Sequence, residues 1–106
     1  MDLRDYQERV GTWLDENLPA TNILIQALAL CEETGEAARA VVKMELGIRG
    51  TREQWMKELE DEVGGAFAAL LCLCHKAGID LQAAVEVQWQ KTLATDLSVE
   101  RMPDRG

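Results

Sequence analysis

Aromatic residues are scarce in this sequence, at 5% of its 106 residues, so a hydrophobic core must rest on leucine, valine, isoleucine and alanine. Only two prolines are present, which argues against long loops. Basic residues are also few: 11 Lys and Arg stand against 19 Asp and Glu, for a net charge of −8. Such a chain is not expected to bind nucleic acid or an anionic membrane, and it needs a cation to bind a nucleotide.

The three cysteines lie in apolar helical sequence, at Cys31, Cys72 and Cys74. Their odd number and the lack of a CxxC pair exclude a disulfide framework or a zinc ribbon, so we expect small buried side chains in a reducing compartment. Charged residues occur from the start of the chain, at Asp2, Arg4 and Asp5, unlike in a signal peptide, and the apolar run at residues 66–74 is too short to span a bilayer. These features favour a cytoplasmic protein.

The apolar residues recur with helical rather than strand-like spacing, which predicts an all-α fold. Good N-cap residues and terminating glycines divide the chain into four segments. The expected helices cover about residues 3–16, 22–45, 51–77 and 80–97. We therefore expect a four- to five-helix bundle within one domain at residues 1–97, followed by a flexible tail at residues 98–106.

The third predicted helix is apolar nearly all round, because residues 63–74 include no charged side chain. A helix of this kind is normally buried on several sides. A chain of this length has difficulty surrounding it, so we expect a homodimer or a dimer of dimers, that is, a homotetramer. The alternative is that the other three helices cover it.

The second predicted helix contains an acidic cluster within otherwise apolar sequence, in the stretch CEETGEAARA, residues 31–40. With about 100° of rotation per residue, Glu33 and Glu36 share one face, and Glu32 lies about 40° from Glu36. Like charges at this spacing repel each other. Either water on an exposed surface or a divalent cation held by carboxylate oxygens would offset the repulsion.

The third predicted helix carries further acids in KELEDEVGG, residues 57–65. Glu62 lies about 80° from the middle of its apolar face, Glu58 about 120°, and Asp61 nearly opposite. Glu62 is therefore the acid expected to point toward the neighbouring helix, where facing carboxylates form a cation site. The competing interpretation is an ordinary solvated, charged helix face.

Several stretches together resemble the MazG-like, all-α nucleoside triphosphate pyrophosphohydrolases. The stretches are Tyr6-Gln7, the EETGE motif within residues 31–43, the acidic start of the third helix, GIDL at residues 78–81, and Lys91. The resemblance covers about residues 3–95. It implies hydrolysis of a nucleoside or deoxynucleoside triphosphate to the monophosphate and pyrophosphate, with Mg²⁺ as the cofactor or Mn²⁺ in its place.

The resemblance also implies roles for individual residues. Glu33 and Glu36 match metal ligands, and Glu32 matches a catalytic residue that orients or deprotonates water. Lys43 and Lys91 match basic positions that contact phosphates. Trp13, or alternatively Trp89, is a candidate for stacking on the base, although an apolar-stripe tryptophan more often belongs to the core.

The signature of the family that the chain resembles is EExxE followed, after a gap, by ExxD, and this second part fits the sequence in two registers. A literal ExxD reading selects Glu58 and Asp61. Counting back from GIDL without a gap instead selects Glu62 and puts Gly65 where an aspartate ligand is expected. We favour this second register, in which Glu62 is a ligand and Asp61 is the additional acid that precedes it.

Departures from the family pattern motivate a second hypothesis. Besides Gly65, Gln88 and Thr92 replace a lysine and an asparagine that are common in the family. These differences favour a degenerate module that binds a nucleotide or a protein without hydrolysis. The intact EETGE motif favours the hydrolase over this alternative.

Overall fold

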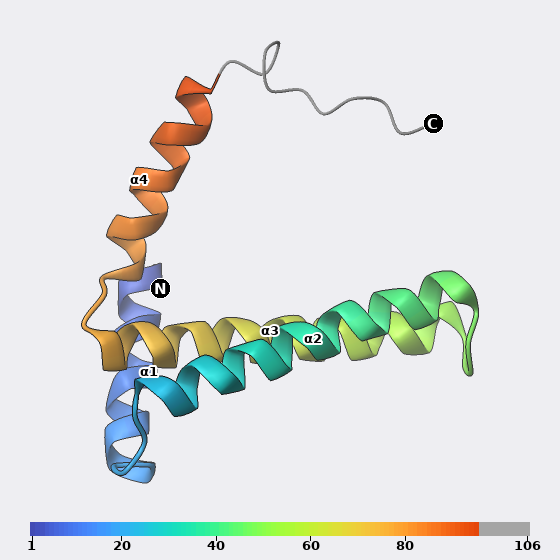
Figure 1. Cartoon of the computed structure of the whole chain (residues 1–106), viewed down its shortest axis with the longest axis horizontal. Coiled ribbons are helices and arrows are strands. Elements are labelled where there is room, and N and C mark those ends of the chain that lie inside the picture. The colour runs from blue at the N-terminus through green and yellow to red at the C-terminus, as the bar shows by residue number, and fades with distance from the viewer. Residues whose placement is uncertain (96–106) are drawn as a thin grey trace.

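The computed structural model describes residues 1–95, and these residues form four α-helices and no strand, which confirms the predicted all-α fold class. Figure 1 shows two long helices side by side, with a shorter helix crossing them at one end and another leading away. The helices are α1 (Leu3–Asn17), α2 (Ile23–Leu46), α3 (Arg52–Ala77) and α4 (Leu81–Ala94).

Local capping explains where the helices begin. Asn22 accepts a hydrogen bond from the backbone of Ile25 at the start of α2. Thr51 and Gln54 form the predicted capping box of α3. Asp80 caps α4, which ends at Ala94 rather than near residue 97 as predicted. Residue 97 and the predicted tail at residues 98–106 lie outside the described part of the chain.

Helices α2 and α3 form an antiparallel hairpin that is the longest part of the molecule (Figure 1). Gly47, in the left-handed conformation at φ 65°, ends α2 and leads into the connection. Gln26 and Ala40 of α2 and Ala69 of α3 are buried in the hairpin region. The small side chains of Ala40 and Ala69 let the two helices approach closely, which sets the distance that polar side chains must bridge between them.

Helix α1 packs across the C-terminal half of α3, where most of the buried apolar side chains lie. Gly11 allows the closest approach, since a Cβ atom there would collide with the ring of His75. The Nε2 atom of this ring lies 2.9 Å from Oδ2 of Asp15. Leu14 and Leu71 are the largest fully buried side chains, so the small core lies at one end of the hairpin.

Helix α4 is anchored to α1 and turns away from the hairpin (Figure 1). The Gln7 amide donates to the carbonyl of Ile79 (2.6 Å) and accepts from the backbone of Leu81 (3.0 Å). Arg4 forms an ion pair with Asp80 at 2.8 Å. The connection between α3 and α4 is therefore fixed by α1, while α4 itself extends beyond it.

Two observations bear on the predictions from composition. Cys31 is exposed, so the expectation that all three cysteines are buried was wrong for this residue; Cys74 is buried and Cys72 partly so. Cys31 lies on the outer side of α2, where no other described helix packs. No single helix within residues 1–95 is long and apolar enough to cross a membrane; only α3 and α4 together, bent by 108°, meet the criteria of length and composition.

Candidate metal centre

Three carboxylates from the two hairpin helices converge midway along the hairpin. Glu33 and Glu36 come from α2 and Glu62 from α3, and one carboxylate oxygen of each lies within 4.8 Å of the others. Glu33 and Glu62 are partly buried, and Glu36 is exposed. The prediction from helical angles that Glu62 points toward the neighbouring helix is confirmed. Carboxylate oxygens in this number fit a hard divalent cation such as Mg²⁺, which keeps water in its remaining positions.

Gly65 makes room for one of these carboxylates. A Cβ atom at this position would lie 2.5 Å from Oε2 and 3.2 Å from Cδ of Glu33. The side chain of Glu33 therefore lies against the backbone of α3. The resemblance places an aspartate ligand at position 65. The Glu33 carboxylate from the opposite helix occupies the space beside this position.

The carboxylates strongly influence one another. The pKa of Glu62 is raised from 4.5 to about 7, first because its protonated form shares a hydrogen bond with Glu36, then because burial disfavours its charge. Repulsion from the negative charges of Glu36 and Glu33 adds to the shift, as does a hydrogen bond with Glu58. One proton or one cation would relieve the repulsion within this cluster.

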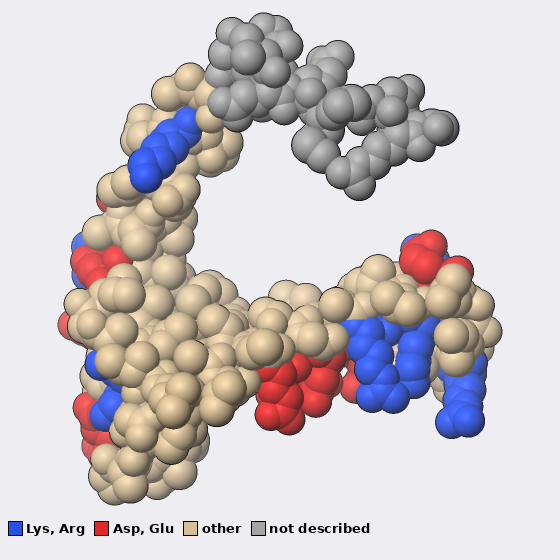
Figure 2. Space-filling model, in the orientation of Figure 1, with Lys and Arg blue, Asp and Glu red and all other residues tan. Residues whose placement is uncertain are grey.

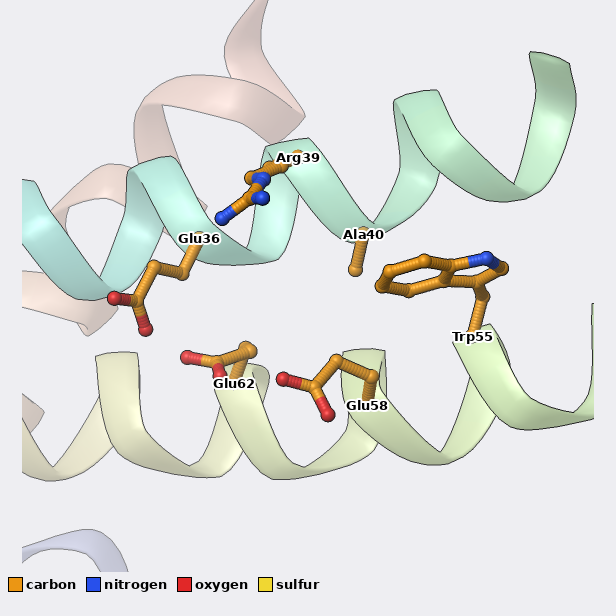
Figure 3. Close-up of a pocket in the computed structure, with 6 residues that line it drawn as sticks. All are labelled: Glu36, Arg39, Ala40, Trp55, Glu58 and Glu62. Atoms are coloured by element: carbon orange, nitrogen blue, oxygen red, sulfur yellow. The ribbon is translucent and has the colours of Figure 1, made fainter. Parts of the chain in front are cut away.

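A cavity of about 340 Å³ opens beside the cluster. Figure 3 shows Glu36 and Glu62 pointing toward each other across the gap between α2 and α3, with Glu58 next to Glu62. Arg39 and Trp55 line the cavity at the other side of these acids. The Lys43 ammonium lies 5.2 Å from the centre of the Trp55 ring, a cation–π contact. Arg39 therefore lines the same cavity as the acids, and Lys43 contacts the ring of another lining residue, Trp55.

Two further acids predicted for the site lie outside the converging group. Glu32 is exposed on α2 and lies about 100° around the helix from Glu33. Asp61 is exposed and is likewise about 100° from Glu62 on α3. The register that uses Glu62 therefore describes the hairpin better than the one that uses Asp61.

The three predicted substrate-binding residues, Lys43, Lys91 and Trp13, lie apart from one another within a single chain. Lys43 is near the cavity, but Lys91 lies on α4, which packs against α1 and not along the hairpin. Trp13 is 54% exposed and borders a separate cavity between α1 and α3, next to Cys72. Of these three predicted residues, only Lys43 lies near the cavity in the described chain, through its contact with Trp55.

Arg39 and Trp55 were not identified from the sequence. Arg39 follows Glu36 by three residues, and Trp55 precedes Glu58 and Glu62 by three and seven. Both therefore lie on the same helix faces as the acids, and a search for cations and aromatics at these spacings would have found them. Their position makes them better candidates than Lys91 and Trp13 for contact with a ligand at this cavity.

Comparison of the chain with protein-family models, with curated proteins and with solved structures found no match. The candidate site therefore stands on its own geometry and on the motif resemblance.

Proposed function

We propose that this protein is a Mg²⁺-dependent nucleoside triphosphate pyrophosphohydrolase that releases a nucleoside monophosphate and pyrophosphate. The observation that carries the proposal is the convergence of Glu33, Glu36 and Glu62 beside a cavity with cationic residues. The EETGE motif, which supplies two of the three acids, is the main point of resemblance to the MazG-like hydrolases. A cytoplasmic location, where such substrates occur, is part of the proposal.

The charges around the cavity fit a triphosphate with its cation. A triphosphate alone would be repelled by this net acidic group of side chains. Glu33, Glu36 and Glu62 would hold a Mg²⁺ ion, whose charge would offset the negative charge of the phosphates during phosphoryl transfer. Arg39, which lines the cavity with the acids, and Lys43, which contacts Trp55, would contact phosphate oxygens that extend from the site. The face of Trp55 offers an apolar surface for a base or a sugar.

Each acidic residue has a distinct part in the proposed reaction. Glu33, Glu36 and Glu62 would hold the cation. The oxygen of a water molecule bonds to the α-phosphorus as the anhydride bond to pyrophosphate breaks, and a carboxylate accepts the water's proton. Glu32, by its motif position, is the candidate for this base. It is exposed in the described chain, so it would act only from the edge of the site.

Replacement of Glu36 by glutamine tests this function. Turnover of a panel of nucleoside triphosphates with Mg²⁺, followed by ³¹P NMR, should show monophosphate and pyrophosphate for the wild type and no product for Glu36→Gln. Glu60→Gln is the matched control, since this exposed acid lies on the outer side of α3. Equal activity of the Glu36 variant and the wild type would remove the cluster from the reaction.

A non-hydrolytic binding module is the second candidate function. It is favoured by Gly65, which leaves α3 with one acid fewer at the site than the MazG-like pattern. Calorimetry with Mn²⁺ and a non-hydrolysable triphosphate distinguishes the two. Binding that requires Glu33 and Glu62, without turnover of any substrate, would support the module; absence of binding would contradict both functions.

A further inference from the structure

A second cavity lies where α1 turns into α2, at the opposite end of the hairpin from the α2–α3 connection (Figure 1). Its volume is about 420 Å³, within the range of small-molecule sites. Residues 17–21 line it together with Ile25 and Gln26 from the start of α2. Gln26 precedes Glu33 by about 10 Å along the axis of α2. The cavity shares no lining residue with the one beside the carboxylates, so it is a separate site.

Gln26 is the only buried polar side chain among residues 1–95, with 7% of its surface exposed. Its amide nitrogen donates a hydrogen bond to the Thr21 hydroxyl at 2.8 Å. Within the described residues, the amide oxygen and the second N–H of this side chain have no hydrogen-bond partner. No unpaired side-chain nitrogen or oxygen of these residues is sealed from solvent. The amide oxygen therefore reaches open space, and Gln26 lines the cavity that provides it.

Two further neutral polar groups border the same cavity. The Asn17 side chain donates from Nδ2 to the carbonyl of Trp13 at 2.9 Å, which leaves its own carbonyl oxygen as an acceptor. The Thr21 hydroxyl accepts the hydrogen bond from Gln26 and keeps its hydrogen for donation. The lining therefore offers both donors and acceptors, and none of them is charged.

The rest of the lining is apolar. It consists of Leu18, Pro19, Ala20 and Ile25, of which Leu18 and Ile25 are each 49% exposed. Figure 2 shows uncharged surface over the corner where α1 meets α2, with charged side chains at its outer edge. Apolar walls with a few convergent polar groups are the usual form of a small-molecule site.

We infer that this cavity binds a small neutral cyclic amide, that is, a lactam. The N–H and C=O groups of a lactam lie on the same side of the ring. They can therefore pair with the amide oxygen and the second N–H of Gln26 through two parallel hydrogen bonds. The carbon atoms of the ring would contact Leu18 and Ile25, which removes apolar surface from water on both sides.

Other classes of ligand fit this lining less well. A hydrocarbon would cover the Gln26 amide without pairing it, which costs free energy. An anion or a cation would find no opposite charge among the lining residues. A lactam combines an apolar body with one donor and one acceptor, which are the groups that the lining complements.

Titration of the ¹⁵N-labelled full chain with 2-piperidone, followed by NMR, tests the inference. A dissociation constant on the order of 1 mM is expected for so small a ligand. The backbone signals of residues 17–26 and the side-chain amide signals of Gln26 should shift. N-methyl-2-piperidone, which lacks the donor, should bind about 10-fold more weakly. No cation or nucleotide is added, so the result does not depend on the proposed hydrolase activity.

Gln26→Met removes the amide and keeps a side chain of similar length. It should weaken binding of 2-piperidone about 10-fold and remove the preference over the N-methyl compound. Gln90→Met makes the same change at an exposed position of α4 and should bind as the wild type does. If Gln26→Met loses its helical circular dichroism signal, Ala20→Leu provides a second test. This exposed residue lies outside the helices, and a larger side chain there should fill the cavity.

Three results would overturn the inference. One is the absence of shifts at residues 17–26 with 2-piperidone. Another is equal affinity for the two lactams, which would identify an unselective apolar cavity. The third is binding that survives in both Gln26→Met and Ala20→Leu, which would place the ligand elsewhere on the molecule.

Discussion

Replacement of Gly65 by alanine is expected to weaken binding of Mn²⁺ or Mg²⁺ while leaving α3 folded. The added Cβ atom would lie 2.5 Å from Oε2 and 3.2 Å from Cδ of Glu33. Non-bonded heavy atoms are comfortable at about 3.5 Å or more, so the Glu33 carboxylate would have to shift by roughly 1 Å. One of the three oxygens that lie within 4.8 Å of one another would then leave the group.

The two effects of this substitution differ in size and sign. Alanine in a helix interior is more stable than glycine by up to about 1 kcal/mol, which favours the variant. The Glu33 carboxylate is at the end of a flexible side chain, so moving it costs little folding free energy. Its movement away from the other two carboxylates also reduces the repulsion within the cluster. Changes that misplace a metal ligand typically cost about 10- to 100-fold in affinity. We therefore expect equal or higher thermal stability together with weaker cation binding.

Gly64→Ala is the matched control, because the neighbouring glycine lies in the same helix and a Cβ atom there meets nothing within 4 Å. It should gain a similar helix-propensity term, about 0.4–1 kcal/mol, and bind the cation as the wild type does. Isothermal titration with Mn²⁺ measures the affinity, and thermal denaturation without cation measures stability. The same pair of assays applies to both variants.

A result in which Gly65→Ala and Gly64→Ala bind Mn²⁺ equally well would refute the positioning role of Gly65. A double-mutant cycle with Glu33→Gln makes the test sharper. If Gly65 acts through Glu33, adding Gly65→Ala to Glu33→Gln should produce no further loss of affinity. Additive losses would show that the glycine influences the site by another route.

Two further predictions concern stability. Because the pKa of Glu62 rises from 4.5 to about 7 on folding, the folded state binds the proton more strongly, so stability should fall as pH rises through this interval in the absence of a divalent cation. Glu62→Gln should flatten that dependence in thermal melts from pH 4.5 to 8, and an unchanged slope would contradict it. Gly11→Ala should destabilise the protein by about 1–3 kcal/mol through its collision with His75, whereas Gly35→Ala, with open space around it, should not. Urea denaturation compares the two, and equal stability would argue against a close α1–α3 contact.

The starts of α2, α3 and α4 and the end of α3 were predictable because their causes are local. Asn22, Thr51 and Asp80 cap backbone groups within three residues of themselves, and Gly78 adopts the left-handed conformation that ends α3. Cation binding by the acids was inferred from angles around single helices, which is also local information. The pairing of Glu62 with the acids of α2 needed only the further assumption that neighbouring helices are antiparallel.

The direction of α4 was not predictable, because it depends on contacts across the whole chain. Gln7 holds both sides of the connection at Ile79 and Leu81, more than 70 residues away in sequence. Without these contacts, a short link would be expected to fold α4 back along the hairpin, and Lys91 would come near the cluster. The position of Lys91 relative to Lys43 within one chain therefore depends on information that the residues around Lys91 do not contain.

Gly65 shows how a correct register can lead to an incomplete interpretation. The sequence places it at the level of the EETGE acids, and the structure agrees, with Glu33 lying against it. Packed helices are about 8–10 Å apart, so a glutamate from one helix can reach the backbone of the other only if the opposing residue lacks a side chain. An aspartate at 65 would compete with Glu33 for the same space. The absence of an acid at this position therefore does not by itself rule out the proposed cation site. It is a condition for the position that Glu33 adopts.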